Sequence, residues 1–298
     1  MNLVINWDVT PEIIEGWKTP NFYGLLFVTG LILGYMVVKR MYKREGVHEK
    51  YLDKLVLFVV IATIVGARLG HVLFYGPYFD EVGTNGILLQ EGYFSHPLSI
   101  IKIWEGGLAS HGGALALVLA LYLYSRRVVK LPMIWILDRI VAPIAIAACF
   151  IRFGNLMNSE IVGITTDVPW AFSFSNYYND AGYPDPSPRH PAQLYEAISY
   201  IFTFLILMWL FWKKKMYEKP GFLFGSFLIL LFGARFFVEF VKLGQTARDE
   251  TWFLNTGQML SVPFVLVGIF ILWRSLKTTP KPLDLSGLTA DPSPSKKA

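Results

Sequence analysis

The sequence predicts an all-α integral membrane protein with seven transmembrane helices. Of its 298 residues, 54% are hydrophobic and only 16% are charged, whereas soluble globular chains carry about 25% charged residues. The apolar runs are about 20 residues long, which suits membrane-spanning helices and exceeds the length of barrel strands. We expect spans at residues 21–40, 55–76, 107–126, 132–151, 191–212, 220–241 and 258–274.

The basic residues indicate the topology of these spans. Eighteen Lys and Arg lie in the stretches 39–54, 126–130, 213–219 and 274–298, and five lie in loops on the opposite side. Because positive charge collects in cytoplasmic loops, we expect the N-terminus outside and the C-terminus in the cytoplasm. The basic loops then face anionic lipid, so the net charge of +5 indicates no nucleic-acid partner. We expect one seven-helix transmembrane domain, 1–275, and a disordered cytoplasmic tail, 276–298.

The chain has a single cysteine, Cys149, which excludes an internal disulfide and a multi-cysteine metal site. It lies in an apolar run, so we expect a packed small side chain. The N-terminus lacks the pattern of a cleavable secretory signal, since three acidic residues precede its first basic residue, Lys18. The first apolar helix is therefore expected to act as an uncleaved insertion signal.

The most informative stretch runs from Arg152 to Gly163, where the fourth apolar run is expected to end in a polar loop. It contains one Arg, Asn155, Asn158 and Glu160. An Arg at the edge of the hydrocarbon region is costly unless it meets water, a partner or a lipid headgroup. On its own the stretch fits a snorkelling Arg and an ordinary turn as well as it fits a site.

Polar residues of six or seven predicted helices lie at one depth, the outer headgroup region. Each has a structural reading, such as an ion pair within one helix or an aromatic belt. Independent structural residues would scatter in depth, so their agreement favours a polar cavity open to the outer leaflet. The set comprises Tyr23, Arg68, His71, His111, Arg152, His190, Gln193, Tyr195, Glu196, Arg235, Glu239 and Gln258. Only the Asp138–Arg139 pair lies toward the cytoplasm, and we interpret it as structural.

The residue types limit the chemistry. The sequence has no His-Glu-x-x-His, Gly-x-Ser-x-Gly or Gly-Asp motif, which argues against metalloproteases, rhomboid-like proteases and presenilin-like proteases. The histidines lack metal-ligand spacing, so we expect no metal and no cofactor. Two Arg from different helices suit a phosphate, and His111 is the natural base near neutral pH. The site therefore suits direct transfer in which a phospholipid phosphate departs and a nucleophile loses a proton.

Six motifs occur in order over about residues 15–275: Phe22–Gly24, Trp104–Gly113, Arg152–Gly163, His190–Glu196, Gly233–Phe240 and Gly257–Ser261. Together they resemble the motifs of bacterial prolipoprotein diacylglyceryl transferases. The resemblance implies a seven-helix inner-membrane enzyme with a periplasmic N-terminus and a site facing the periplasmic leaflet. Its partners would be membrane lipids, among them phosphatidylglycerol, and a prolipoprotein signal peptide. The diacylglyceryl group would pass to the lipobox cysteine, and a glycerol phosphate would leave.

The resemblance also implies a role for individual residues. The catalytic residues would be His111, Arg235 and Tyr23, and the phosphatidylglycerol-binding residues would be Arg152, Asn155, Glu160, Gly163 and Glu239. To these we add a supporting polar network of Arg68, His71, His190, Gln193 and Glu196. The chain departs from the family pattern at Phe22, where Trp is more usual, at Ile151, where Gly is common, and in the individual loop 173–188.

Two other functions compete with this prediction. A lipid or anion transporter could use the same cationic cavity, but it would need a path to the cytoplasmic side, where Asp138–Arg139 is the only polar group found. A purely structural scaffold would leave the common depth of the polar groups unexplained. The sequence also leaves open whether His111 or an Arg-lowered thiol pKa accounts for deprotonation of the substrate thiol.

Overall fold

The computed structural model describes residues 4–14, 16–17, 20–82, 88–103, 107, 109–179, 181–244, 252–279 and 283–289. Among these residues, seven helices are long and apolar enough to cross a membrane. Contacts divide the chain into two compact units. Unit 1 comprises Met1–Met41 and Leu137–Pro282, and unit 2 comprises Tyr42–Ile136 and Leu283–Ala298.

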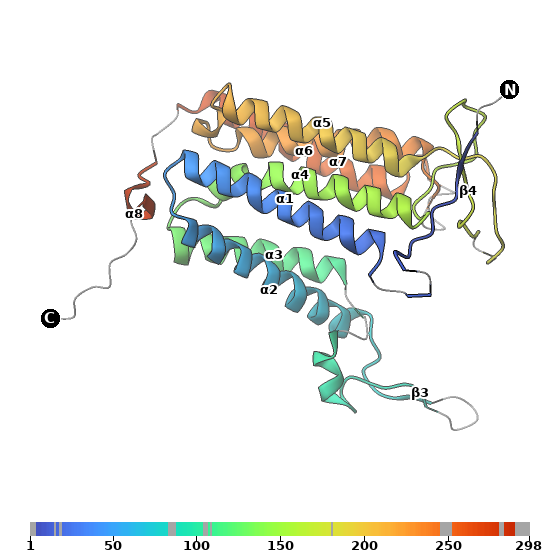
Figure 1. Ribbon diagram of the computed structural model, residues 1–298. Coiled ribbons are helices and arrows are strands. Elements are labelled where there is room, and N and C mark those ends of the chain that lie inside the picture. The colour runs from blue at the N-terminus through green and yellow to red at the C-terminus, as the bar shows by residue number, and fades with distance from the viewer. Residues whose placement is uncertain are drawn as a thin grey trace. The chain divides into compact units, whose positions relative to one another are not determined.

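Unit 1 is built on the first helix and the last four long helices. In it α6 contacts both α5 and α7, and Figure 1 shows these helices side by side. Its apolar core joins side chains of α1, α4, α5 and α6, and Cys149 is fully buried there, as expected. The bounds are α1 (Phe22–Arg44), α4 (Met133–Met157, in unit 1 from Leu137), α5 (Ala192–Trp212), α6 (Phe222–Val238) and α7 (Thr256–Lys277).

A buried carboxylate of α4 fixes the start of α6. Asp138 accepts hydrogen bonds from the backbone N–H groups of Gly221 (2.7 Å) and Phe224 (2.9 Å). The first N–H groups of a helix have no partner within the helix, and a carboxylate satisfies them well. The structural role expected for Asp138 is thus that of a helix cap.

The other end of unit 1 carries a short strand pair. Strand β1 (Ile5–Trp7) pairs in parallel with β4 (Phe172–Phe174), and the indole of Trp7 donates to the Leu156 carbonyl (3.0 Å). Both β4 phenylalanines are buried with Leu156 and Val162. These three-residue strands add to the predicted all-α architecture, because such short segments give no alternating pattern in the sequence.

Unit 2 centres on α2 (Glu49–Phe74) packed against α3 (Ser110–Leu123), which continues as a π-helical turn to Val129. The two helices cross at glycines. A Cβ atom on Gly70 would lie 2.7 Å from Cα of Gly112. Small residues allow membrane helices to approach this closely, so a larger residue at Gly112 would force them apart.

The periphery of unit 2 contains a hairpin of β2 (Glu81–Val82) and β3 (Leu88–Gln90), a 3-10 helix, Pro97–Ile101, and α8 (Ser286–Thr289). Leu288 of α8 is buried, and its carbonyl accepts from the backbone of His48 (2.9 Å). Part of the segment expected to be disordered, 276–298, is therefore docked, and α7 continues to Lys277. Residues 280–282 and 290–298 of that segment lie outside the described residues.

The structure differs from the predicted spans most at two helix ends. Helix α2 begins at Glu49 rather than at 55, and α4 continues to Met157 rather than ending at 151. The expectation that Arg152 opens a polar loop was therefore wrong. The Arg152 guanidinium donates to the side chain of Asn155 one turn later (3.1 Å), so polar groups satisfy one another within the helix and the helix continues.

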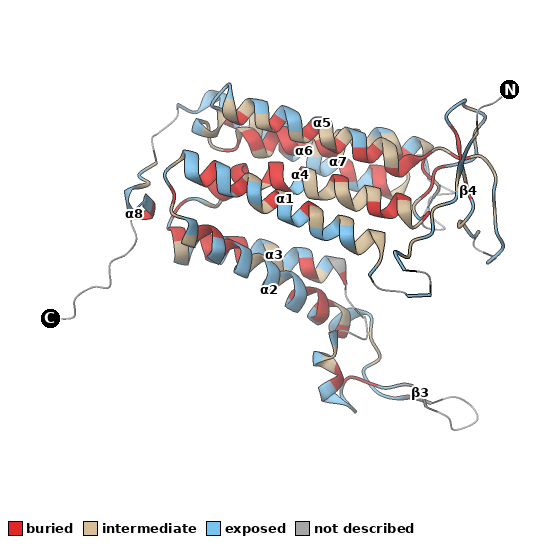
Figure 2. Cartoon of the chain, viewed as in Figure 1, coloured by how far each residue is buried: buried red, intermediate tan, exposed pale blue. Residues whose placement is uncertain are grey.

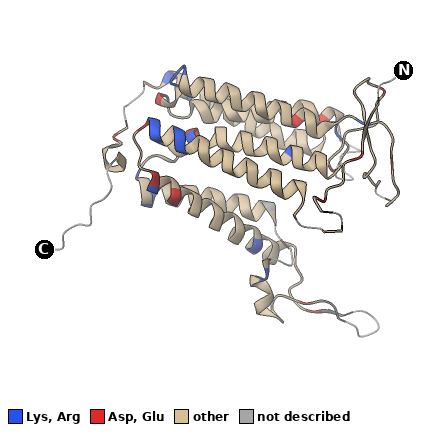
Figure 3. Cartoon of the chain, in the orientation of Figure 1, with Lys and Arg blue, Asp and Glu red and all other residues tan. Residues whose placement is uncertain are grey.

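The surface of the helices is largely apolar. Figure 2 shows exposed residues along the long helices. On α7 eight large apolar side chains are 45–60% exposed: Leu260, Phe264, Leu266, Val267, Ile269, Phe270, Trp273 and Leu276. Apolar surface of this extent suits contact with lipid. Figure 3 shows Lys and Arg gathered where α1 and α5 end, near the loops predicted to be cytoplasmic.

Candidate active site

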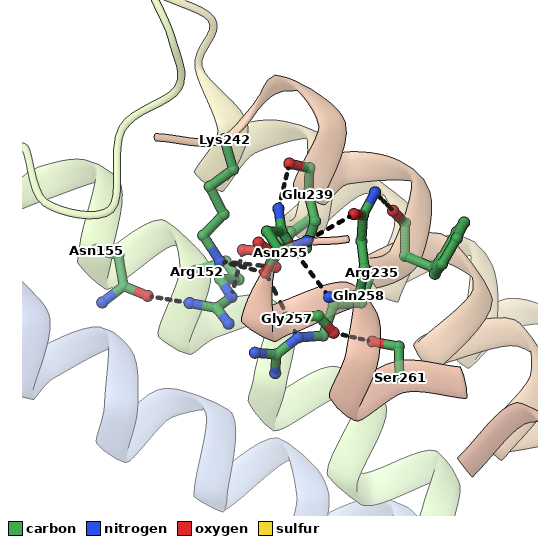
Figure 4. Close-up of polar contacts among 11 residues, drawn as sticks. Arg152, Asn155, Arg235, Glu239, Lys242, Asn255, Gly257, Gln258 and Ser261 are labelled. Atoms are coloured by element: carbon green, nitrogen blue, oxygen red, sulfur yellow. Dashed lines mark hydrogen bonds and ion pairs between the residues drawn. The ribbon is translucent and has the colours of Figure 1, made fainter. Parts of the chain in front are cut away.

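A polar cluster lies among α4, α5 and α6 of unit 1 (Figure 4). Its first member, Arg152, projects from α4 and is mostly buried. Its Nε lies 2.8 Å from Oε2 of Glu196 on α5, whose side chain is only 1% exposed. Nη1 donates to the side-chain oxygen of Asn155 (3.1 Å). A buried carboxylate and an amide therefore hold this guanidinium in one orientation.

Asn155 links Arg152 to Glu160. Its amide nitrogen donates to Oε1 of Glu160 (2.8 Å), and Asn158 donates to the same oxygen (3.2 Å). The fully buried Gln193 of α5 donates to the backbone carbonyl of Glu160 (2.6 Å). The turn after α4 is thus fixed by Asn155 and Asn158, from the same stretch, and by Gln193 of α5.

The second guanidinium, Arg235, lies near the end of α6. Its Nε is 3.7 Å from Oε1 of Glu239, one turn later, and its side chain is 30% exposed while that of Glu239 is 8% exposed. Among the described residues no hydrogen bond is made by its Nε. Among the described residues, Arg235 is therefore held by its charge and not by a hydrogen bond at Nε.

Lys242 joins the two halves of the cluster. Its Nζ donates to Oε1 of Glu239 (3.0 Å) and lies 3.7 Å from Oε1 of Glu196. The charges thus alternate in the order Arg152, Glu196, Lys242, Glu239, Arg235. We call these five residues the charge chain. The two guanidinium groups predicted to share a site lie at its two ends.

Helix α7 packs against Glu239 of the charge chain at Gly257. A Cβ atom at Gly257 would overlap the carboxylate of Glu239, so no larger residue fits without moving that group. The side chain of Asn255 donates to the backbone carbonyl of Glu239 (2.9 Å) and caps α7 together with Gln258. The start of α7 therefore fixes both the backbone carbonyl and the carboxylate of Glu239.

Gly163 lies between two neighbouring segments. Its N–H donates to the His190 carbonyl (2.9 Å), and its carbonyl accepts from the buried Arg189 (3.2 Å). A Cβ atom there would lie 2.6 Å from the Val241 carbonyl. Gly163 thus permits a close backbone approach. The side chain of His190 lies beside Tyr195 (Nδ1 to Oη 3.1 Å), and burial lowers the pKa of its imidazole.

Tyr23, near the start of α1, lies against α4. A Cβ atom on Gly154 would lie 2.7 Å from a ring carbon of Tyr23, so the ring rests on the glycine. Gly154 lies between Arg152 and Asn155 in α4. The structure thus brings Tyr23 to the helix that carries the predicted phosphatidylglycerol-binding residues.

Two of the predicted residues, Arg68 and His71, form a separate group in unit 2. Arg68 donates to the carbonyls of Ser99 (2.6 Å), Ile100 (2.7 Å) and Gly107 (3.0 Å). Its guanidinium therefore clamps the loop before α3. His71 stacks on Tyr75. We call this arrangement the Arg68 clamp.

His111 is exposed in the first turn of α3, also in unit 2. That His111 and the charge chain of unit 1 form one active site stays a prediction.

Comparisons with known proteins address the family. A sequence profile described as prolipoprotein diacylglyceryl transferase matches residues 14–274. The chain belongs to this family. The phosphatidylglycerol–prolipoprotein diacylglyceryl transferase of Tolumonas auensis is 44% identical over 272 residues, which cover 91% of this chain and 97% of the relative. Relatives of the same name from Porphyromonas gingivalis and Chloroherpeton thalassium are 42% and 39% identical, each covering 92% of this chain and 95% of the relative.

The comparisons confirm the family expected from the motifs, and the seven apolar helices make this transferase a multi-pass membrane protein. One member of the charge chain, Lys242, is not singled out by the sequence pattern, because it lies among the five basic residues expected in the outer loops. The available signal was its position three residues after Glu239. Asn255 was also missed, although it directly precedes the Gly257–Ser261 motif.

Proposed function

We propose that this chain transfers the diacylglyceryl group of phosphatidylglycerol to the lipobox cysteine of a prolipoprotein, the first step of lipoprotein maturation. The observation that carries the proposal is the charge chain. Two guanidinium groups on different helices lie at its ends, and Nε of Arg235 makes no hydrogen bond among the described residues. Guanidinium groups bind phosphate oxygens in pairs. The names of the relatives fit the same reaction.

The reaction needs only the two substrates. The cysteine thiol loses its proton, and the thiolate attacks the glycerol carbon that bears the phosphate ester. A carbon–sulfur bond forms while the carbon–oxygen bond breaks, and the electron pair leaves with the glycerol phosphate. Negative charge therefore grows on the phosphate, where fixed cations stabilise the transition state.

Arg152 and Arg235 supply those cations. In the proposal Asn155, Glu160, Gly163 and Glu239 orient them. Tyr23 contacts the headgroup from α1, and His111 accepts the thiol proton directly or through water. A positioned base contributes about 10²–10⁴ in rate. Near wild-type turnover of a His111→Gln enzyme would remove His111 from this role.

The remaining residues of the predicted network support the site. Arg68 and His71 hold the loop that precedes His111, and His190, Gln193 and Glu196 hold the α4–α5 side. We place the enzyme in the inner membrane of a bacterium, with its N-terminus and site at the periplasmic leaflet and its C-terminus in the cytoplasm. Phosphatidylglycerol would enter laterally from the surrounding lipid.

The transporter alternative gains no support from the polar pair toward the other end of α4. Asp138 instead accepts two backbone N–H groups at the start of α6. The carboxylate contributes to helix packing, which is the role we assign to it.

The test is product formation by the purified full chain. In detergent, phosphatidylglycerol and a synthetic lipobox peptide should yield a peptide that carries one diacylglyceryl group by mass spectrometry, with one glycerol phosphate released per adduct. A peptide with serine in place of cysteine and a reaction with phosphatidylethanolamine are the controls. A folded protein that forms no adduct would contradict the proposal.

A further inference from the structure

Lys242 is among the most deeply buried cations of unit 1. It follows the short 3-10 turn Glu239–Val241 at the end of α6, and its side chain is only 3% exposed. Lysine normally extends its ammonium group toward water. Here the group instead points inward, between the carboxylates of Glu239 and Glu196.

The backbone around Lys242 explains why the side chain stays there. Leu243 donates to the Val162 carbonyl (3.1 Å), and Ile164 donates to the Val241 carbonyl (3.0 Å). Lys242 therefore pairs with Gly163 as in an antiparallel strand pair. A lysine fixed on both sides by backbone bonds delivers its ammonium group to one place.

Both carboxylates that Lys242 contacts also contact an arginine. Glu196 holds Arg152, and Glu239 holds Arg235. Neither oxygen of Glu196 receives an aligned hydrogen bond among the described residues, so its orientation depends on the two cations beside it. Without Lys242, each carboxylate would have its arginine as its only cation in the charge chain.

The charge balance leads to the same result. The charge chain has three cations and two carboxylates, so one positive charge is left over for an anion. Removing the ammonium group would leave two of each, and each arginine would be fully compensated by a carboxylate. A phosphate would then compete with a buried carboxylate for each guanidinium group.

We propose that Lys242 is a positioning residue that engages Glu196 and Glu239, so that Arg152 and Arg235 remain available to the phosphate of the lipid. The inference rests on the proposed function, since it concerns the same site. Lys242 touches neither substrate in this account and acts through its two carboxylate partners.

The main test compares Lys242→Met with Lys242→Arg in the purified full-length enzyme. Lys242→Met should raise KM for phosphatidylglycerol by about tenfold or more and also lower kcat, because binding and leaving-group stabilisation use the same arginines. Lys242→Arg keeps the charge and should recover most of both constants. Arg139→Met removes another buried cation of unit 1, about three and a half turns along α4 from Arg152, and should leave KM unchanged.

A double variant separates positioning from a general loss of stability. Adding Glu196→Gln to Lys242→Met restores one surplus positive charge, so its KM should fall back toward the wild-type value. A KM that is equal in Lys242→Met and wild type, with only the folded fraction reduced, would overturn the inference. So would a double variant with a KM above that of the single variant.

The two proposals fail in different ways. If the wild-type enzyme forms no diacylglyceryl peptide, the proposed function fails. If it forms the product and Lys242→Met does so with wild-type constants, only the role of Lys242 fails.

Discussion

The charge chain of unit 1 and the Arg68 clamp of unit 2 use arginine in opposite ways. Arg68 directs three nitrogens at backbone carbonyls of one loop, whereas Arg235 pairs, among the described residues, with the carboxylate of Glu239 at 3.7 Å. A guanidinium group has five N–H donors, so bonds to carbonyls consume the capacity that binds a phosphate. Arginines that look alike in an apolar sequence thus differ in the acceptors that their N–H groups bind.

The largest expected effect comes from replacing the arginine at either end of the charge chain. Arg235→Lys keeps the charge but loses the planar fork, so transfer to the lipobox peptide should fall about 10²–10³-fold, the usual loss when one transition-state donor is removed. Arg152→Lys should behave similarly. Steady-state assays with the purified enzyme check this, and wild-type rates in both variants would argue against paired phosphate binding.

A second change moves a carboxylate of the charge chain without altering any charge. Gly257→Ala places a methyl group on the Glu239 carboxylate, so we expect activity to fall by up to about 10²-fold, as small misplacements can cause. Gly34→Ala on α1 is the matched control, since its Cβ would lie 3.5 Å from Pro143, an ordinary contact. Equal activity of the two variants would show that Glu239 adjusts freely.

In the Arg68 clamp we expect loss of stability to dominate. Arg68→Lys cannot reach all three carbonyls, and each buried carbonyl left unpaired costs about 1–3 kcal/mol. Thermal unfolding should shift downward, and amide hydrogen exchange should rise at residues 99–101. Protection like that of the wild type would mean that the loop is held by other contacts.

The smallest expected effect is at Asp185. Its partner Arg189 donates to the backbone carbonyl of Gly163 and to the carboxylate of Asp185. Hydrogen bonds from Ser187 and Arg189 lower the pKa of Asp185 to about 2. Because the folded-state pKa lies below the unfolded value of about 4, this carboxylate stabilises the fold above pH 4, and the contribution is lost as the pH falls toward 2.

Asp185→Asn should therefore lower the unfolding temperature at pH 6 by an amount equivalent to at most about 1 kcal/mol. The difference from wild type should disappear near pH 2. Unfolding curves between pH 2 and 6 measure it, and a gap that stays constant with pH would contradict the assigned cause.

Hydropathy located all seven helices because a bilayer imposes a minimum apolar length. It misplaced the ends of α2 and α4, since polar residues such as Arg152 and Asn155 satisfy one another within a helix. Residue types identified Arg152, Glu196, Arg235 and Glu239. Lys242 was missed because a lysine just beyond an apolar run is normally solvated, and only tertiary contacts show it buried. The different role of Arg68 could not be predicted, because it depends on the positions of loop carbonyls, and these carry no sequence signal.

Direct binding of phosphatidylglycerol tests the central claim, that the charge chain holds the lipid phosphate while the Arg68 clamp holds a loop. We would titrate the lipid into purified wild-type, Arg235→Lys and Arg68→Lys proteins at a temperature where all three are folded. The account predicts a Kd raised about tenfold or more in Arg235→Lys and a much smaller change in Arg68→Lys. Equal changes in both variants, or a larger one in Arg68→Lys, would contradict it.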